Sequence, residues 1–166
     1  MTVKREYFDY CSDLHGIQHT YRVMVLAHRL GTVLNKIRER DLAIKAAFIH
    51  DMARRDDGRD IFHGLRACKT KIHLLEGTKR ELREIQTAVY NHCEPKDIKP
   101  GHPHYVTAMI LKDADLLDRV RMDKEIDWRR ARFTETRQLE GYARTLLKIT
   151  FDGDIFKDTV SRHQES

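Results

Sequence analysis

The apolar residues of this chain recur with the period of an α-helix, and this recurrence is the feature that most limits its fold. In residues 17–38 they fall three or four positions apart, as one buried face of a helix requires. Stretches that alternate polar and apolar residues, as strands do, are missing. The chain therefore predicts an all-α bundle of about six helices. The expected helices span residues 17–38, 41–53, 62–75, 79–92, 104–121 and 139–149.

Local signals predict where some of these helices begin and end. Asp41 is suited to cap the second helix. Thr78 followed by Glu81 is the signature of a capping box at the start of the fourth helix. Pro95, Pro100 and Pro103 cluster in one polar segment, which is the clearest break in the chain.

Length and composition predict one domain over residues 1–166. No apolar run approaches the roughly 18 residues of a membrane span, and the charged N-terminus does not resemble a secretory signal. Cys11, Cys68 and Cys93 are odd in number and lack CxxC spacing, so neither a disulfide framework nor a cysteine zinc site is indicated. A cytoplasmic protein with reduced thiols is the simplest interpretation.

The net charge of +5 and the pI near 9.2 favour anionic partners. The basic residues are interspersed with 26 acidic ones, however, so a solvated surface of mixed charge is the first explanation. A small phosphorylated compound is the next candidate partner, and nucleic acid is the least favoured of the three. No feature of the sequence sets the oligomeric state.

The placement of the histidines points to a metal site. His19 lies on the apolar face of the first helix, and His50 with Asp51 ends the apolar run of the second, in "AAFIHDMARRDDGRDIFHG". Asp115 is embedded in the apolar segment "MILKDADLLDRV", where a bare carboxylate is costly unless it is paired or bound to a metal. Neighbours on a helix point about 100° apart. His50 and Asp51 can therefore reach one ion only near a helix end or across an opening between helices.

A single inward histidine is more often a hydrogen-bonded core residue than a ligand. The joint arrangement carries the argument, because imidazole and carboxylate together form the ligand set of zinc, iron or manganese. On spacing alone, a metal site and a structural role are equally supported.

The order His19, His50–Asp51, Asp115 resembles the HD superfamily of metal-dependent phosphohydrolases. The neighbouring motifs match as well, in "HGIQHTYRV", "AAFIHD", "FHG", "YNHCE" and "KDADLLDRVR". "HDMARRDDGRD" followed by "HG" resembles a branch of small, mostly uncharacterised bacterial members. The resemblance covers residues 13–121 and implies an HD-domain helical bundle. Residues 122–166 form a helical extension without an interpretable motif.

The resemblance implies that His19, His50, Asp51 and Asp115 hold one metal ion. In members with two ions the HD aspartate bridges them, and His63 and His92 occupy the places of the additional ligands. Two ions suit phosphoester hydrolysis because they activate a water and stabilise the leaving oxygen. The ions would be Fe, Mn, Zn or Mg, with Asp51 as the central catalytic residue. The alternatives are a hydrogen-bonding role for His63 and a helix-dipole contact for His92.

Four arginines near these positions are candidate phosphate ligands, since a guanidinium binds phosphate through two hydrogen bonds. Each is also explained as a surface or salt-bridge residue. They are Arg22, Arg54, Arg55 and Arg119.

The leading functional hypothesis is a metal-dependent hydrolase of a small phosphorylated compound or nucleotide. Two alternatives stay open, since they use the same ligand set. One is a mixed-valence diiron oxygenase of the HD fold, and the other is a non-catalytic nucleotide or metal sensor.

Overall fold

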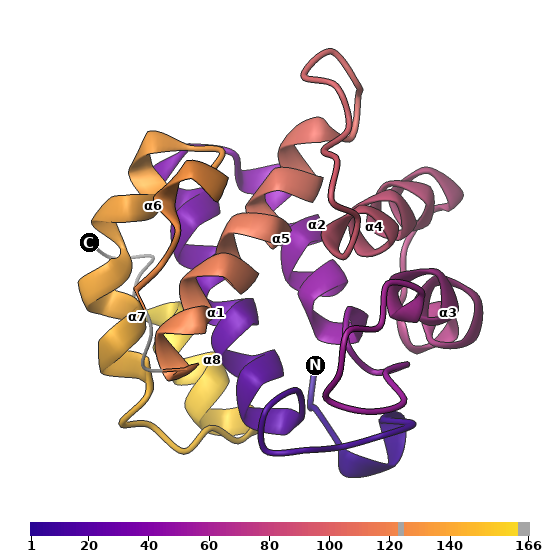
Figure 1. Ribbon diagram of the computed structural model, residues 1–166, viewed down its shortest axis with the longest axis horizontal. Helices are drawn as coiled ribbons and strands as arrows, with labels where there is room; N and C mark the ends of the chain where they lie inside the picture. The colour runs from indigo at the N-terminus through magenta and orange to yellow at the C-terminus, as the bar shows by residue number, and fades with distance from the viewer. Residues whose placement is uncertain (123–124, 163–166) are drawn as a thin grey trace.

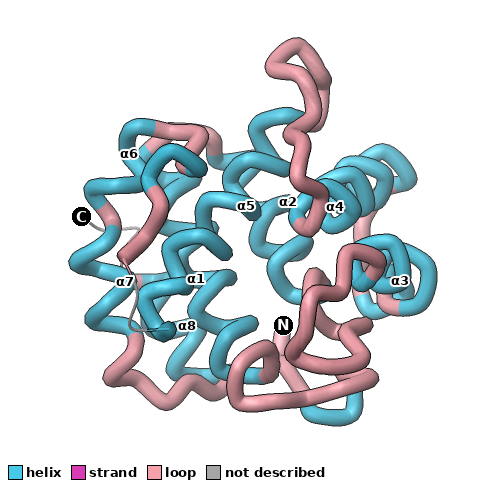
Figure 2. The backbone as a smooth tube through the Cα atoms, in the orientation of Figure 1, coloured by secondary structure: helices cyan, strands magenta, loops and turns pink. Residues whose placement is uncertain are grey.

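The computed structural model describes residues 1–122 and 125–162. Throughout these residues the regular structure is helical, and Figure 2 shows helices joined by loops without a strand. The all-α prediction is confirmed. The α-helices are α1 (Ile17–Val33), α2 (Ile37–Ile49), α3 (His63–Thr70), α4 (Lys79–His92), α5 (Tyr105–Asp118), α6 (Thr134–Gln138), α7 (Glu140–Leu146) and α8 (Gly153–Ser161).

Helices α1, α2 and α5 form the centre of the bundle. α1 packs most extensively against α2 and α5, and α4 packs against both α5 and α2. α3 lies on α4 at one side of the molecule, while α6, α7 and α8 lie beside α1 at the other (Figure 1). Fully buried side chains of α1, α2 and α5, such as Leu26, Ile49 and Leu111, fill the space between the three helices.

The capping box predicted at the start of α4 is confirmed. Thr78 accepts a hydrogen bond from the Glu81 backbone, and the Glu81 carboxylate accepts one from the Thr78 backbone. The predicted cap at Asp41 is wrong, because α2 already begins at Ile37. Asn35 adopts a positive φ of 53°, which turns the chain sharply after α1 and lets the next helix start at once. Asp41 instead accepts a hydrogen bond from Arg40.

Several helices are shorter than their apolar patterns predict. α1 ends at Val33, α2 ends at Ile49, and α5 continues only as a 3-10 turn, Arg119–Met122. The apolar spacing persists past each end because turn residues such as Met52 and Ala53 also point into the core. Burial alone therefore does not mark where a helix stops.

In its described residues, 125–162, the extension after α5 holds three short α-helices, where the sequence predicted one. It is attached to α5 through Asp113, which is fully buried. The Asp113 carboxylate accepts hydrogen bonds from the backbone N–H groups of Arg132 and Phe133 and from the Thr136 hydroxyl. The Arg132 guanidinium binds Asp97 as well. These contacts hold the first part of the extension against the core.

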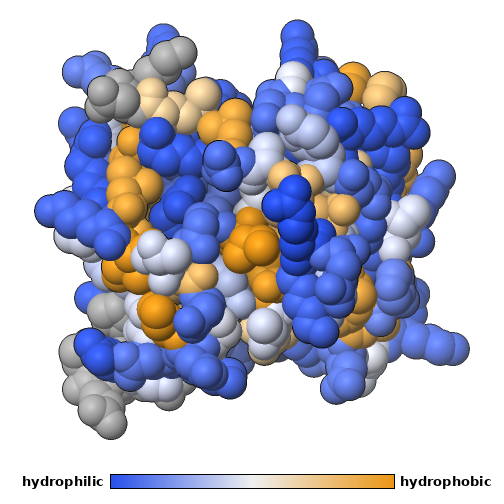
Figure 3. All heavy atoms as spheres, turned by 90° about the horizontal axis from the view of Figure 1, so that it is seen from below, coloured by the Kyte–Doolittle hydropathy of each residue, from blue (hydrophilic) through white to orange (hydrophobic). Residues whose placement is uncertain are grey.

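None of the helices in the described residues is both long and apolar enough to cross a membrane. The face in Figure 3 is largely hydrophilic, and its hydrophobic side chains gather in small separate groups.

Candidate metal centre

Five helices bring the six predicted ligands to one place. His19 comes from the first turn of α1, and Asp115 comes from α5. The other four stand at helix ends. His50 caps the C-terminus of α2 and Asp51 follows it, while His63 begins α3 and His92 ends α4. The expectation that His50 and Asp51 meet one site near a helix end agrees with this geometry.

The Nδ1 atoms of the four histidines are each held by an oxygen of the protein. For His50 the partner is the Ala47 carbonyl, 2.7 Å away, and for His19 it is the Asp118 carboxylate, also 2.7 Å away. His63 and His92 use the backbone carbonyls of Asp60 and Val89. A carbonyl only accepts, so Nδ1 carries the proton and Nε2 of a neutral ring carries a lone pair.

The free Nε2 atoms face one another in two pairs. The Nε2 atoms of His19 and His50 are 3.1 Å apart, and those of His63 and His92 are 2.7 Å apart. Two ligand nitrogens about 2.0–2.1 Å from one ion stand at comparable separations. Lone pairs that face one another in a buried place repel unless a cation or a proton lies between them. The donor set therefore fits metal ions.

The Asp51 carboxylate lies between the two imidazole pairs. Its Oδ1 is 3.0 Å from Nε2 of His63 and 3.5 Å from Nε2 of His92. Its Oδ2 is 3.4 Å from Nε2 of His19 and 3.7 Å from Nε2 of His50. Burial opposes the charge of Asp51, but the neighbouring imidazoles outweigh it and hold its pKa well below the usual range. The carboxylate is therefore ionised, with one oxygen toward each pair.

The electrostatics of the first imidazole pair also favour a cation. Burial opposes the charge of His19, yet hydrogen bonds to Asp118 and Asp51 raise its pKa to about 9. Burial lowers the pKa of His50 to about 3, which keeps its Nε2 lone pair free. The Asp115 carboxylate stands 3.5 Å from Nε2 of His19. This side of the site thus combines two carboxylates with the neutral imidazole of His50 and the imidazole of His19, whose surroundings favour a positive charge.

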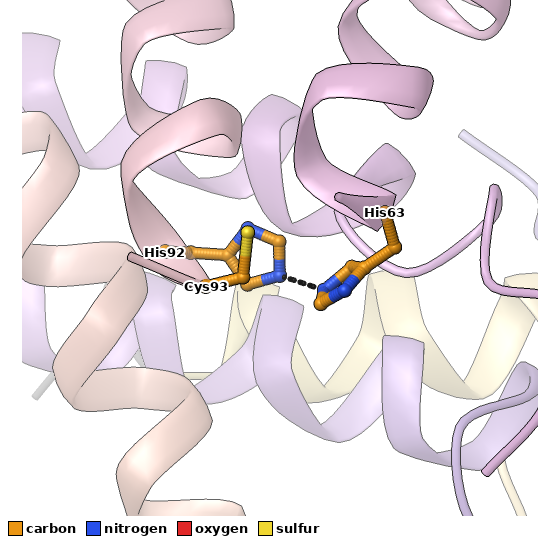
Figure 4. A group of neighbouring side chains, drawn as sticks. All are labelled: His63, His92 and Cys93. Atoms are coloured by element: carbon orange, nitrogen blue, oxygen red, sulfur yellow. Dashed lines mark hydrogen bonds between the residues drawn. The ribbon is translucent and has the colours of Figure 1, made fainter. Parts of the chain in front are cut away.

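Gly64 explains why His63 reaches His92. A Cβ at Gly64 would lie 2.4 Å from the Val89 carbonyl oxygen, so only glycine lets α3 approach the backbone of α4 this closely. The "FHG" motif thereby positions the first residue of α3 against the last residue of α4. Figure 4 shows His63 and His92 pointing toward each other from these two helices.

Cys93 is a neighbour of this pair that the sequence analysis did not identify. Its Sγ lies close enough to His63 and His92 to belong to a possible metal-holding group, and Figure 4 shows it beside His92. The thiol donates to the Ile61 carbonyl at 3.3 Å. Burial raises its pKa, which keeps it protonated at neutral pH. Cys93 is therefore a neutral thiol beside the two imidazoles, and only a bound cation would turn it into a thiolate ligand.

A cavity of about 550 Å³ opens onto the site. Asp51, His63, His92 and Asp115 line it from the metal-centre side. His15 lines it as well, with Nδ1 2.9 Å from the Asp57 carboxylate. The sequence analysis gave His15 no role, and it lies in the turn before α1, four residues before His19.

The predicted arginines divide into two groups. Arg54 and Arg119 line the cavity, as phosphate ligands would. Arg22 instead directs its guanidinium to Asp118, with Nε 2.6 Å from Oδ1, and Arg55 is exposed outside the cavity lining. Three arginines that the sequence analysis did not select also line the cavity, namely Arg59, Arg121 and Arg130.

Asp118 is the most important contact that the sequence analysis missed. It is fully buried, and it holds His19 while binding Arg22 and Arg121. Its spacing of three residues from Asp115 on α5 was a usable signal, because such residues share one helix face. A carboxylate behind a ligating histidine orients the ring and raises its basicity.

Replacing this carboxylate should weaken metal binding without abolishing the fold. We expect Asp118→Asn to lower the affinity of the His19 side for a divalent ion by about 10–100-fold, the usual effect of losing such a partner. Competition against a chelator measures it. Asp113→Asn is the matched control, since it removes another buried carboxylate of α5 that does not touch His19. Equal affinities in the two variants would show that Asp118 does not tune the site.

Comparison with known proteins adds one finding. The family model described as HD domain matches residues 16–120, which include all six candidate ligands. The comparisons with curated proteins and with solved structures gave no match.

Proposed function

The chain belongs to the HD-domain family, and on this basis we propose that it is a metal-dependent phosphohydrolase acting on a small phosphorylated compound or nucleotide at a two-metal site. HD domains are generally metal-dependent hydrolases that bind divalent metals. One observation carries the proposal beyond the family. The Asp51 carboxylate directs one oxygen to each of two imidazole pairs at the wall of an arginine-lined cavity.

The proposed ligand sets follow from these contacts. His19, His50, Asp51 and Asp115 would hold one ion, and His63 and His92 would hold the other together with Asp51. When bound, two such ions would supply an activated water and stabilise the charge of the phosphoryl group. Iron, manganese, zinc and magnesium all remain compatible with nitrogen and oxygen ligands, and the first three suit imidazole better.

The other residues of the cavity supply binding and proton transfer in this proposal. Arg54 lies 3.6 Å from Asp51 and is held by the Gly58 carbonyl, so its guanidinium is fixed beside the metal centre. It would bind the phosphoryl oxygens there. His15, oriented by Asp57, is placed to carry a proton to the leaving oxygen.

A panel of phosphomonoesters and phosphodiesters tests the proposed function. The protein loaded separately with Mn, Fe, Zn or Mg should release phosphate or alcohol from at least one member, equally well with and without oxygen. Activity that requires oxygen would replace the hydrolase by an oxygenase. Binding of the panel without turnover under every metal condition would replace it by a sensor.

A further inference from the structure

Arg119 and Arg130 stand where three neighbouring cavities meet. Both line the 550 Å³ cavity of the metal centre and a small cavity of about 30 Å³ that also touches His92 and Asp115. Both also line a third cavity of about 90 Å³, which no candidate metal ligand borders. Arg119 and Arg130 therefore border both the cavity of the metal centre and a neighbouring cavity that no candidate metal ligand lines.

Neither guanidinium directly contacts a carboxylate in the described part of the chain. Arg119 and Arg130 form no side-chain hydrogen bond or ion pair there. Two carboxylates border the third cavity, Glu125 and Asp127. Asp127 is bound by Arg129 through contacts of 2.8 and 3.0 Å, and the charge of Arg130 also acts on it from a longer distance. The two guanidinium groups thus keep their hydrogen-bond donors available to a ligand.

Apart from Arg59, the other arginines of these cavities have partners. Arg54 binds Gly58, and Arg121 binds Asp118. Arg132 binds Asp97 and Asp113. Arg59 is also without an ion pair in the described residues, but it lines only the main cavity and comes from the loop after Asp51. Binding a single phosphate beside Arg54 does not require Arg119 and Arg130 as well, so these two unpaired cations call for another anionic group.

The position of Arg130 is prepared by the extension and not by the family core. Arg130 ends the 3-10 turn Trp128–Arg130, ten residues beyond the matched segment. Two residues later the backbone is fixed to α5, because buried Asp113 accepts hydrogen bonds from the N–H groups of Arg132 and Phe133. A backbone held this way delivers the Arg130 side chain to the cavity at a reduced entropic cost on binding.

From these observations we infer that Arg119 and Arg130 form a second anion site, so that the substrate carries at least two anionic groups. The inference rests on the proposed function, in which the first phosphate lies at Arg54 and the metal centre. The second group binds to the guanidinium groups of Arg119 and Arg130 and is a phosphate or a carboxylate, both of which accept forked hydrogen bonds from arginine. The 550 Å³ cavity falls within the roughly 300–1,000 Å³ of small-molecule sites. Through Arg130 the extension thereby takes part in selecting the substrate.

Binding of phosphonates tests this inference without requiring turnover, because a phosphonate has no ester bond to hydrolyse. Three probes share a phosphonate on a three-carbon chain. Propylphosphonate has no second anionic group, propane bisphosphonate has a second phosphonate at the other end, and phosphonobutyrate has a carboxylate there. Titration calorimetry of the metal-loaded protein, without oxygen, gives their affinities. We expect at least one of the two probes with a second anionic group to bind about tenfold or more tighter than propylphosphonate. The tighter probe identifies the second group.

The variant Arg130→Ala and its control Arg144→Ala separate the site from general charge. Arg144 is an arginine of α7 that is paired with Glu140 and does not line any of these three cavities. We expect Arg130→Ala to bring all three probes to within about threefold of one another, while propylphosphonate binding stays unchanged. Arg144→Ala should keep the wild-type preference.

The outcomes distinguish this inference from the proposed function. Equal affinity of the wild-type protein for all three probes, or equal loss in both variants, overturns the second anion site even if phosphoesters are hydrolysed. A preference that Arg130→Ala removes supports the site even if no phosphoester is hydrolysed, in which case the hydrolase proposal alone fails.

Discussion

Asp51→Asn should lower hydrolysis of a responsive phosphoester by several orders of magnitude while the helical fold is retained. The amide keeps the size of the carboxylate but removes the negative charge that faces both imidazole pairs. Each proposed ion loses a shared anionic ligand at once, so both coordination spheres and their spacing change together. Hydrolysis rate, metal content and far-ultraviolet circular dichroism are measured on one preparation.

Asp56→Asn is the matched control for this experiment. Asp56 lies in the same loop, and its carboxylate accepts a hydrogen bond from the Gly58 backbone. That variant should keep activity and metal content close to wild type. If Asp51 only formed a buried pair with Arg54, 3.6 Å away, its loss would lower stability and leave catalysis and metal content intact. Wild-type activity and metal content in Asp51→Asn would therefore refute the metal-centre assignment.

His92→Ala should leave one ion per chain where the wild-type protein holds two. The imidazole contributes one of the two Nε2 atoms on its side of Asp51, and the other belongs to His63. An ion left with His63 and one shared carboxylate oxygen is bound too weakly to survive purification, while the His19 side keeps its ligands. Elemental analysis of the purified protein gives the ratio of metal to chain.

The matched variant for this experiment is His104→Ala. His104 also contacts α4, through the Thr87 hydroxyl at 2.9 Å, but it lies outside the candidate ligand set. It should retain two ions. The same metal content in His92→Ala and wild type would mean that His92 has a structural role, as the alternative based on the helix dipole proposes.

The core of the fold follows from the sequence because its helices are built from regular apolar spacing. The pattern predicts α1 to α5 in the correct order, and the Thr78 capping box locates the start of α4 to the residue. The errors lie at helix ends. Asp41 is an acceptable cap by residue type, but the turn at Asn35 starts α2 earlier. Cap preferences of about 1 kcal/mol do not override such a constraint on the chain.

The candidate ligands could be selected from the sequence for a similar reason. His19, His50, Asp51 and Asp115 are polar residues at inward helical positions or at the end of an apolar run, where a cost of burial marks them. His63 and His92 were assigned through the resemblance to the HD superfamily. Asp118 carries the same signal and was overlooked, because Asp115 already satisfied the expected motif. Its role depends on its contact with His19, which lies 99 residues earlier in the chain. Local spacing in the sequence does not predict such a contact.

The arginines show where sequence reasoning stops. Proximity to His19 suggested Arg22, but a buried carboxylate on α5 takes its guanidinium. Arg130 has no periodic neighbours and no motif. It reaches the cavity because Asp113 binds the backbone N–H groups of Arg132 and Phe133, just after Arg130 in the chain. Tertiary contacts of the backbone decide where an exposed, flexible side chain lies. Local sequence patterns do not reveal these contacts.

Anomalous diffraction from crystals of the metal-loaded protein tests the central claim most directly. Data collected at the absorption edge of the bound metal should show two peaks per chain. One should lie by the Nε2 atoms of His19 and His50, and the other by those of His63 and His92, with the Asp51 carboxylate between them. A single peak, or two peaks that do not share Asp51, would contradict the two-metal centre.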